Sequence, residues 1–494
     1  MRVIIIGGGL GGLFTAALLA HNGVTVEVFE RNAVIGGGLQ TFVRHGLRCE
    51  TGMHVLGGFQ QGGTLHRICR YLGILDRLDI HALPSDGMAH VRGLDDGIDI
   101  KLPQGREAYT DALVQQFPSE ADAIRRYVAA IYAIAHGVDL YNLRPDYSIM
   151  SIDRQASMPV GAFLDQFTHN ASLQRVLACA SLLYDAQGGQ TPAYVHALIS
   201  VLYINGSSMF GSSSQQLADV LAQSICRQGG TVHTGCPVTA IQVCDRQVSG
   251  IVTADGAGHH ADAYVSSLHP LQTIRLCTEG AFPRIYVQRL QSIHNSTSAF
   301  KVYYEVQASR LAPVTSPVYL FDKTERLWHL SDDDDLWPQG VALFVTQPGL
   351  TQRGTYLLQA VTHLTFDAVR CWSDSYSGHR PQAYLDWKQA QTDRVTQFVA
   401  RHYEGFTDAV VSSFAASPLT FRDWLDAPRG SIYGFCADAD NVLVSHLPVR
   451  TKVHNLLLTG QSVNLHGICG VPLTAIQTAE AILGQNTILD NLPQ

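Results

Sequence analysis

Three glycines near the amino terminus, Gly7, Gly9 and Gly12, have the spacing G-x-G-x-x-G. In such a turn the first glycine permits a sharp bend, the second lets backbone amides approach a pyrophosphate, and the third lets a helix pack closely on a strand. Glu30 follows at a distance where a carboxylate accepts hydrogen bonds from a ribose diol and repels a 2′-phosphate. The pattern therefore predicts a site for FAD or NAD and disfavours NADP.

The residues around these glycines have the composition of a strand, a helix and a second strand. Residues 2–6 are apolar and rich in β-branched side chains, residues 13–20 are small and aliphatic, and residues 24–28 alternate in hydrophobicity. Gly23 stands where the helix is expected to end. The start of that helix places its positive dipole end at the pyrophosphate. Because the motif has this context, a dinucleotide site is a better interpretation than a plain glycine turn.

Two further runs follow the motif closely. Residues 36–41 read GGGLQT, and residues 46–54 read GLRCETGMH. Either run alone is compatible with a surface loop, but their position favours backbone packed against the same cofactor. The candidate cofactor contacts in this half of the site are Gly7, Gly9, Leu10, Gly11, Gly12, Glu30, Arg31, Gly36, Gly37, Gly38, Leu39, Gln40, Gly52, Met53 and His54.

The composition excludes several classes of protein. A chain of 494 residues with 46% hydrophobic and 15% charged residues predicts more than one domain around a large interior. The net charge of −8, with no cluster of Lys and Arg, argues against nucleic acid as a partner. No apolar run reaches the length of about 18 residues that a membrane span needs.

Cysteine and histidine spacing predicts neither a metal site nor a redox disulfide. The ten cysteines include no CxxC, and the 21 histidines include no HExxH, which favours reduced thiols in a cytoplasm. The acidic run at residues 331–335 lacks the interleaved spacing of a cation site and is interpreted as a solvated loop.

The opening motif, the glycine run and the G-x-H segment resemble the flavin amine oxidase and phytoene desaturase superfamily, with its p-hydroxybenzoate hydroxylase-like fold. The resemblance implies an α/β protein with a Rossmann-type FAD-binding domain and an inserted mixed α+β substrate domain. The implied FAD-binding segments are 1–85, 205–285 and 441–494, and the implied substrate segments are 86–204 and 286–440. The chain departs from the family at Gly38, where Arg or Lys is usual, and at Glu50, where Asp is usual.

The carboxyl-terminal third carries the second part of the resemblance. Residues 417–424 (SPLTFRDW) and 430–434 (GSIYG) closely resemble the carotenoid isomerase and retinol saturase branch. Residues 455–460 read as a buried strand, and Pro472 suits the first turn of a helix over 473–483. The resemblance places the start of that helix at the flavin pyrimidine edge, where its dipole stabilises negative charge. It also implies the contacts Val238, Gly460, Gln461, Gly467, Gly470 and Val471, with Gln461 replacing an acid found in most relatives.

The segments between these motifs predict a mixed substrate region. Residues 64–204 are mostly helical in pattern, and residues 299–306, 341–345 and 356–361 read as strands before a long helix over 381–404. Residues 192–204 are apolar on nearly all faces, so this helix is either buried in a core, the more frequent case, or lines an apolar cavity.

Three functions are compatible with these motifs, all with FAD as cofactor. One dinucleotide motif without a redox cysteine pair indicates direct hydride transfer between flavin N5 and substrate. The first function is desaturation, saturation or isomerisation of C=C bonds in a polyene or isoprenoid lipid. His54 and His466 are its candidate proton-handling residues, although each is equally compatible with a packing role. An apolar substrate of this kind also implies peripheral membrane contact for a cytoplasmic protein.

The second function is that of a flavin amine oxidase, and the third is that of a non-catalytic FAD-binding protein. An amine oxidase usually has a lysine near N5 and an aromatic cage, for which Lys301, Tyr433 and Trp424 are the candidates. The departures at Gly38 and Gln461 keep the third function open. The sequence indicates neither the electron partner nor the direction of the reaction.

Overall fold

The first strand, β1 (Arg2–Ile6), lies at the centre of a five-stranded sheet in which every neighbouring pair is parallel. The strand order is β10 (Thr231–His233), β2 (Thr25–Phe29), β1, β14 (Ala263–Ser266) and β20 (Leu456–Leu458). Val3 and Ile5 pack on one side of the sheet, and Ile4 and Ile6 on the other. Burial on both faces explains why β1 is apolar throughout and does not alternate.

This computed structural model describes residues 1–147, 154–184, 187, 189–322, 337–345, 349–442 and 446–493. The acidic run at 331–335 lies outside the described residues. Within the described ranges, no helix combines the length and the apolar character needed to cross a bilayer.

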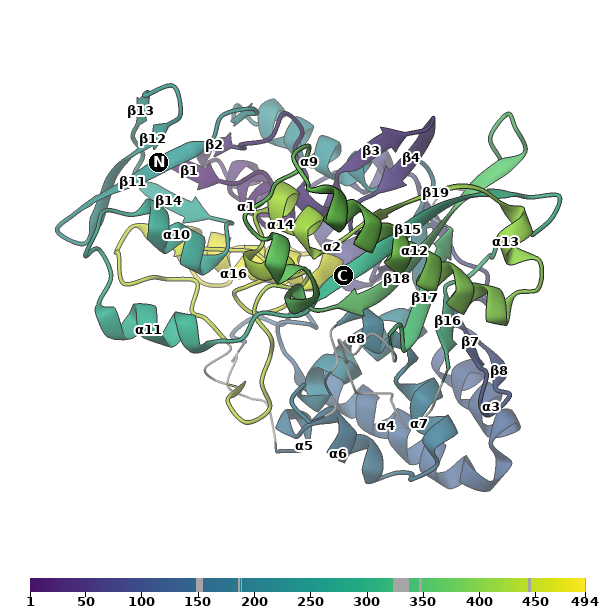
Figure 1. Ribbon diagram of the computed structural model, residues 1–494. Helices are drawn as coiled ribbons and strands as arrows, with labels where there is room; N and C mark the ends of the chain where they lie inside the picture. The colour runs from purple at the N-terminus through teal and green to yellow at the C-terminus, as the bar shows by residue number, and fades with distance from the viewer. Residues whose placement is uncertain are drawn as a thin grey trace.

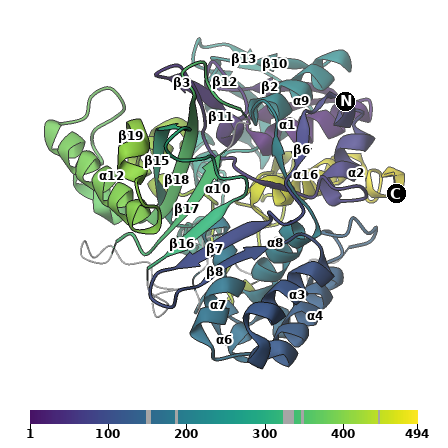
Figure 2. The same cartoon turned by 90° about the vertical axis from the view of Figure 1, so that its right-hand side faces the viewer.

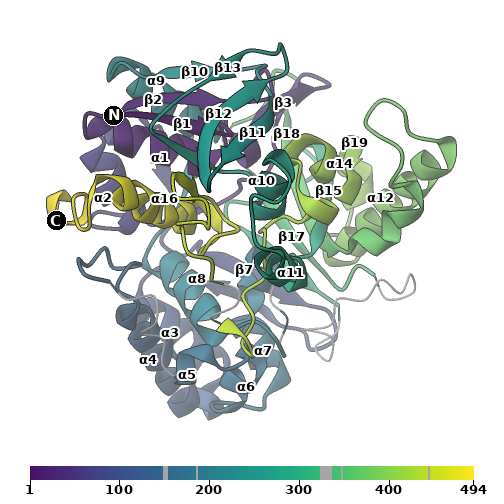
Figure 3. The ribbon, with the colours of Figure 1, turned by 90° about the vertical axis from the view of Figure 1, so that its left-hand side faces the viewer.

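Two layers cover the five-stranded sheet. On one face lie α1 (Leu10–His21), α2 (Thr64–Tyr71), α9 (Gln215–Arg227) and α16 (Gly467–Leu483). On the other lie α10 (Pro270–Leu276), α11 (Arg284–Ser292) and a small antiparallel sheet of β11 (Val238–Cys244), β12 (Gln247–Thr253) and β13 (Gly258–His259). We call the parallel sheet and the elements that cover it the nucleotide-binding layer. Figure 3 shows α16, in yellow, on the side of this layer that faces the helices below it.

A seven-stranded, mostly antiparallel sheet forms the second half of the molecule. Its order is β19 (Val410–Ala416), β15 (Ser298–Gln307), β18 (Thr355–Leu364), β17 (Gly340–Val345), β16 (Val318–Phe321), β7 (Ala89–Gly93) and β8 (Asp99–Leu102). The long helix α12 (Gln382–His402) packs on one face, where Phe300 and Val302 meet Phe398 (Figure 2). Because side chains alternate along a strand, Ala299 and Lys301 project from the opposite face.

A helical bundle lies at the bottom of Figure 1. It contains α3 (Arg106–Gln116), α4 (Ala121–Gly137), α5 (Arg154–Ser157), α6 (Val160–Asp165), α7 (Ala171–Leu177) and α8 (Ala193–Asn205). Helix α8 packs on α4 around one apolar cluster. Small strands complete the fold: β3 (Thr41–Arg44) pairs with β4 (Leu47–Glu50), and β9 (Ser207–Phe210) lies between β5 (Leu56–Gly57) and β6 (Ile80–Ala82).

The predicted elements are confirmed with two corrections. Strands β6, β7 and β8 lie inside residues 64–204, which were expected to be mostly helical, and β7 and β8 join the seven-stranded sheet. Helix α16 begins at Gly467 and not at 473, so Pro472 lies inside it. The residues before the proline are buried and continue the helix, although Pro472 has no N–H to donate to the preceding turn.

The two large sheets draw on different parts of the predicted division of the chain. The five parallel strands fall in 1–85, 205–285 and 441–494, and the seven strands of the second sheet fall in 86–204 and 286–440. The domain boundaries themselves remain predictions.

Candidate FAD and substrate site

A cavity of about 730 Å³ lies between the carboxyl ends of the parallel strands, the second sheet and the start of α16. Its volume is within the range of about 300–1,000 Å³ that small-molecule sites have. Its lining runs from Gly7 and Glu30 at one end to Lys301 and Phe344 at the other. Ligands of open α/β sheets bind at the carboxyl ends of the strands, so the position of this cavity is the expected one.

The glycine turn between β1 and α1 is shaped to admit a ligand. Gly9 lines the cavity and caps α1 without a side-chain hydrogen bond, which leaves the first amides of the helix available. A Cβ atom added at Gly9 would meet no protein atom within 4 Å, so it would fill cavity space. At Gly12 a Cβ atom would lie 2.0 Å from the carbonyl oxygen of Gly7. Gly12 therefore serves close packing of the helix on the turn, while Gly9 faces the cavity.

The acid at the end of β2 is held in place by the backbone. One carboxylate oxygen of Glu30 accepts a hydrogen bond from the amide of Gly8 at 2.7 Å, and the other accepts from the amide of Asn32 at 2.8 Å. The side chain is 7% exposed and lines the cavity. A fixed negative charge therefore stands beside the glycine turn.

Most predicted cofactor contacts meet in this one cavity. Those that line it are Gly7, Gly9, Leu10, Gly11, Glu30, Arg31, Gly37, Gly38, Leu39, Gly52, Met53, His54, Val238, Gly460, Gln461, Gly467 and Val471. Among the others, Gly12 and Gly36 support the turn, and Gln40 donates to the carbonyl oxygen of Val34. Gly470 lines only a smaller neighbouring cavity.

The segment with the branch-specific sequence forms helix α14 (Pro418–Leu425) and its exit loop. Ser417 caps the helix in a reciprocal capping box with Thr420, and Pro418 occupies the first turn. The hydroxyls of Tyr384 and Ser417 are hydrogen-bonded at 2.7 Å. Residues 424–428 of the exit loop line the cavity. The motif therefore fixes the start of a helix whose end covers the site.

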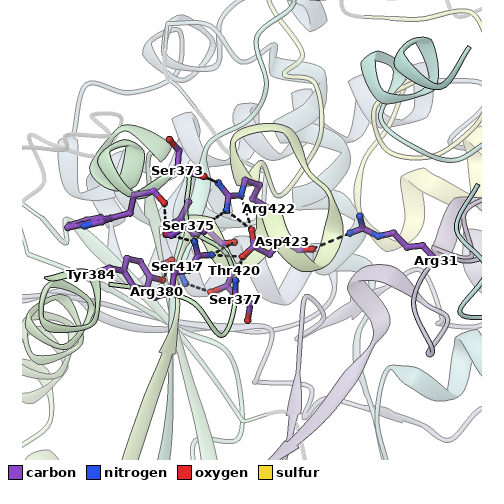
Figure 4. A network of polar contacts seen from close by, with 12 residues as sticks. Arg31, Ser373, Ser375, Ser377, Arg380, Tyr384, Ser417, Thr420, Arg422 and Asp423 are labelled. Carbon is purple, nitrogen blue, oxygen red and sulfur yellow. Dashed lines mark hydrogen bonds and ion pairs between the residues drawn. The ribbon is translucent and has the colours of Figure 1, made fainter. Parts of the chain in front are cut away.

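Asp423 is the centre of a polar network that ties α14 in place (Figure 4). Its carboxylate pairs with Arg380 and Arg422, and it accepts a hydrogen bond from the amide of Ser377 at 2.9 Å. From the other side, the guanidinium of Arg31 donates to the carbonyl oxygens of Asp423 and Trp424. Because Arg31 follows β2 directly, this contact joins the nucleotide-binding layer to the second half of the molecule.

The far end of the cavity contains a buried lysine. Lys301 on β15 is 1% exposed, and its ammonium donates to the carbonyl oxygens of Glu50 at 2.6 Å and Thr51 at 3.2 Å. Burial lowers the pKa of Lys301 to about 7, although the charge of Glu50 opposes the shift. Lys301 therefore lies in the cavity together with the predicted cofactor contacts.

Two half-buried histidines lie on neighbouring parts of the site. The His54 ring stacks on Phe344 with centroids 4.4 Å apart and lines the main cavity. His466, the N-cap residue of α16, packs on Tyr433 at 4.8 Å and lines the smaller neighbouring cavity. Burial lowers the pKa of His54 well below its usual value and the pKa of His466 to about 4, so both rings are neutral near pH 7. The Nε2 atom of each has no hydrogen-bond partner among the described residues.

Sequence motifs did not identify the apolar walls of the cavity. They come from five separate elements and include Leu182, Tyr203, Ala299, Phe344 and Val361. The strand alternation at 299–306 and the apolar pattern at 192–204 were the sequence signals available for predicting these walls. Neither pattern indicates which elements face one another in the fold. Across the described ranges, no three His, Cys, Asp or Glu side chains are grouped to hold a metal ion.

Tyr433 and Trp424, the residues considered for an aromatic cage, have different surroundings. Tyr433 packs on His466, and its hydroxyl donates to the carbonyl oxygen of Leu182. Trp424 is 54% exposed, and its carbonyl oxygen accepts from Arg31.

Comparison with known proteins relates this geometry to a family. The family model described as flavin containing amine oxidoreductase matches residues 10–483. All-trans-retinol 13,14-reductase from Macaca fascicularis is 24% identical over 99% of this chain and 87% of its own length. Prolycopene isomerase 2, chloroplastic, from an Oncidium hybrid cultivar is 23% identical over 87% of this chain and 74% of its own. The crystal structure of an oxidoreductase from Methanosarcina mazei has a TM-score of 0.68 and 16% identity, covering 97% of this chain and 100% of the other.

Proposed function

The chain belongs to the flavin-containing amine oxidoreductase family, and from that premise we propose that it acts on C=C bonds of a polyene or isoprenoid lipid. Its fold is the α/β FAD-binding type with a mixed second region, its cofactor is FAD, and it is an oxidoreductase. Full-length relatives named for retinol reduction and prolycopene isomerisation support the proposed bond type. The proposal covers saturation, desaturation and isomerisation.

The residues present fit FAD. The open space at Gly9 and the free amides of α1 suit a pyrophosphate, and the fixed carboxylate of Glu30 suits a ribose diol. At the other end of the chain, Gly460, Gln461 and the first turn of α16 at Gly467 line the same cavity. We propose that these groups hold the flavin half of the cofactor.

One observation carries the proposed substrate class. The cavity beyond the glycine turn is walled by Ala299, Phe344 and Val361. Two carboxylates of the described residues line the cavity. Glu30 accepts hydrogen bonds from backbone amides and Asp426 pairs with Arg31, so neither is available to pair with a charged substrate at the apolar end. An apolar, uncharged substrate matches such walls, because burying an unpaired charge there is costly.

Bound FAD supplies a hydride acceptor or donor at N5. The apolar walls exclude water and hold the substrate chain, and the neutral rings of His54 and His466 are the proposed proton-handling groups. A neutral imidazole accepts or donates a proton at Nε2, and in both residues this atom has no described protein partner.

The test uses purified protein loaded with FAD and incubated anaerobically with all-trans-retinol or lycopene, once with a reductant and once with an oxidant. We expect the absorption band of one polyene to shift as double bonds are lost, gained or rearranged. The variants His54→Gln and His466→Gln should slow that shift while retaining FAD. An unchanged polyene spectrum under both conditions would contradict the proposal.

Amine oxidation is the second candidate because Lys301 lies in the cavity. A cationic amine, however, would meet at this end a lysine and a neutral histidine, and no carboxylate of the described residues lines this end to pair with it. Peroxide release on addition of primary amines would favour this function over the first.

We also propose that the protein is cytoplasmic and collects its substrate at a membrane surface. Exposed apolar side chains on two adjacent elements support this: Phe42 and Val43 on β3, and Val411 on β19, which meet through a contact between Phe42 and Phe414. Cosedimentation with phospholipid vesicles tests the idea, and Val43→Asp together with Val411→Asp should reduce it. Absence of any cosedimentation would contradict it.

A further inference from the structure

Helix α8 has two apolar faces with different surroundings. One face packs into the helical bundle, where Ala197, Val201 and Ile204 join the apolar cluster that includes α4. The opposite face borders a second, smaller cavity of about 80 Å³. The residues of α8 that line it are Tyr194, Val195, Leu198, Ile199, Leu202 and Tyr203. The apolar character of residues 192–204 therefore serves both a core and a cavity.

This side cavity adjoins the main one. Both are lined by Leu183 and Tyr203 on one side, and by Gln461, Ser462, Gly467 and Ile468 on the other. The first turn of α16 therefore stands between the two spaces. A chain bound in the main cavity has to pass this turn to reach the start of α8.

Among the described residues, the lining of the side cavity holds no Lys, Arg, Asp or Glu. Its walls are mainly aliphatic and aromatic, and its hydrogen-bonding groups are uncharged. His466 lines this cavity, and the Tyr194 hydroxyl is 2.9 Å from Nε2 of His446. Burial lowers the pKa of His446, so this ring is neutral as well.

We propose that the side cavity is a binding subsite for one end of the substrate chain, and that it accepts a hydrocarbon or an alcohol and rejects a carboxylate. The inference deepens the proposed function and rests on it for the polyene nature of the chain. A hydroxyl can share hydrogen bonds with neutral His and Tyr groups, whereas a carboxylate would be buried without a cation. The small volume limits occupancy to the end of a chain.

The experiment compares two probes with the same skeleton, all-trans-retinol and all-trans-retinoic acid. Equilibrium dialysis against the FAD-loaded wild-type protein measures binding without turnover. We expect the alcohol to bind more tightly than the acid by about tenfold or more, because unpaired buried charge is strongly disfavoured. Equal or tighter binding of the acid would overturn the proposal, as would failure of the alcohol to bind.

Variants of α8 locate the binding. Val195→Phe and Leu198→Phe place a bulkier side chain in the side cavity and so reduce its free volume. Each should weaken alcohol binding by about tenfold. Val201→Ile is the control on the opposite face and should leave binding within about twofold, while Ile199→Ala enlarges the cavity and should retain it. Flavin absorbance confirms that each variant is loaded. Unchanged alcohol binding in both filled, FAD-loaded variants would overturn the proposal.

Binding and turnover separate the two ideas. If alcohol binding is lost in the filled variants but no polyene is converted by the wild type, the subsite stands and the proposed function fails. If polyenes are converted and filling changes neither binding nor product, the proposed function stands and the subsite fails.

Discussion

The ammonium of Lys301 donates to the backbone carbonyl oxygen of Glu50 at 2.6 Å, inside the protein. The side chain of Glu50 points elsewhere and accepts from the amide of Ser214, just before α9. Glu50 thus connects two parts of the molecule. Its carbonyl oxygen binds Lys301 of the second sheet, and its carboxylate binds Ser214 at the start of α9 in the nucleotide-binding layer. The lysine lines the cavity at this junction, so its protonation affects both stability and the charge of the site.

Lys301→Met should increase the free energy of unfolding, relative to the wild type, by more at pH 6 than at pH 9.5. Burial lowers the pKa of Lys301 from 10.5 to about 7. Between these values the unfolded chain holds a proton that the folded chain lacks, so the stability of the wild type rises with pH. Below pH 7 both states are protonated, and the full cost of burying the ammonium, on the order of a few kcal/mol, is present. Urea unfolding at both pH values measures the difference.

The exposed residue Lys101 offers the control, because Lys101→Met removes a lysine of the same type from the surface of β8. Its pH profile should run parallel to that of the wild type. If Lys301→Met also runs parallel, the folded protein does not hold Lys301 in its low-pKa state.

The protein should lose stability steeply as the pH falls from about 6.5 toward 4. Burial lowers the pKa to about 4 for a set of histidines: His196, His269, His363, His402 and His466. Their folded pKa is below the unfolded value, so the stabilisation is present above pH 6.5 and is lost as protons bind the unfolded chain. Thermal unfolding followed by circular dichroism from pH 7.5 to 4.5 measures the loss.

His196 gives that prediction a specific control. Its ring nitrogens contact the hydroxyls of Tyr127 and Tyr184, each at 2.7 Å, inside the bundle. His196→Gln removes one titrating group, so the melting temperature should fall less between pH 6.5 and 5 than in the wild type, although the variant starts lower. An equal fall in both proteins would exclude His196 as a contributor.

The sequence predicted the nucleotide-binding layer well because each of its elements carries a local signal. Strand β1 is continuous and apolar since both its faces are buried, and Gly12 is required by a contact between neighbouring turns. Strand β7 was missed because only five residues alternate, two of them Ala89 and Gly93 with low strand propensity. It pairs locally with β8 in a hairpin, and its pairing with β16, more than two hundred residues later, has no local signature.

The candidate site shows the same limit. Gly9 and Glu30 were predicted because a pyrophosphate and a ribose require those residue types at that spacing, and both residues line the main cavity. Phe344 and Leu198 have no such requirement, since any apolar side chain of suitable volume serves there. Which apolar residues meet at the site depends on how two sheets and a helical bundle pack together.

Gly9→Ala and Gly12→Ala should separate cofactor binding from folding. An added methyl at Gly9 meets only cavity space, so the variant should fold with a wild-type melting temperature in its FAD-free form and bind FAD much more weakly. At Gly12 the methyl would lie 2.0 Å from the carbonyl oxygen of Gly7, so the FAD-free protein itself should be destabilised. Thermal melts without FAD and titration with FAD measure the two effects. Normal FAD affinity in Gly9→Ala would place the pyrophosphate elsewhere.

Asp423→Ala should destabilise the protein more than removal of Asp423 and Arg380 together. The side chains of Arg380 and Asp423 are 8% and 13% exposed and form an ion pair. Removing one partner of a buried pair costs about 3–5 kcal/mol because the other charge is left unpaired, whereas Asp423→Ala with Arg380→Met removes both charges of this pair. The third charge, Arg422, is 24% exposed and keeps its hydrogen bonds to the carbonyl oxygens of Ser373 and Ser375. A double-mutant cycle by urea unfolding measures the coupling. Additive effects would mean that solvent already screens the pair.

The same network should control how firmly FAD is held. Residues 424–428 follow α14 directly and line the cavity, and Arg31 holds the carbonyl end of that helix. Arg31→Met keeps the length of the side chain but removes the hydrogen bonds to α14, so the exit loop should open more often and FAD should dissociate faster. Stopped-flow dilution followed by flavin fluorescence measures the dissociation rate. Arg125→Met is the control, because Arg125 lies on α4 in the helical bundle and does not line the cavity, so FAD should dissociate from this variant at the wild-type rate. Equal dissociation rates in the Arg31 variant and the wild type would show that α14 does not cover the bound cofactor.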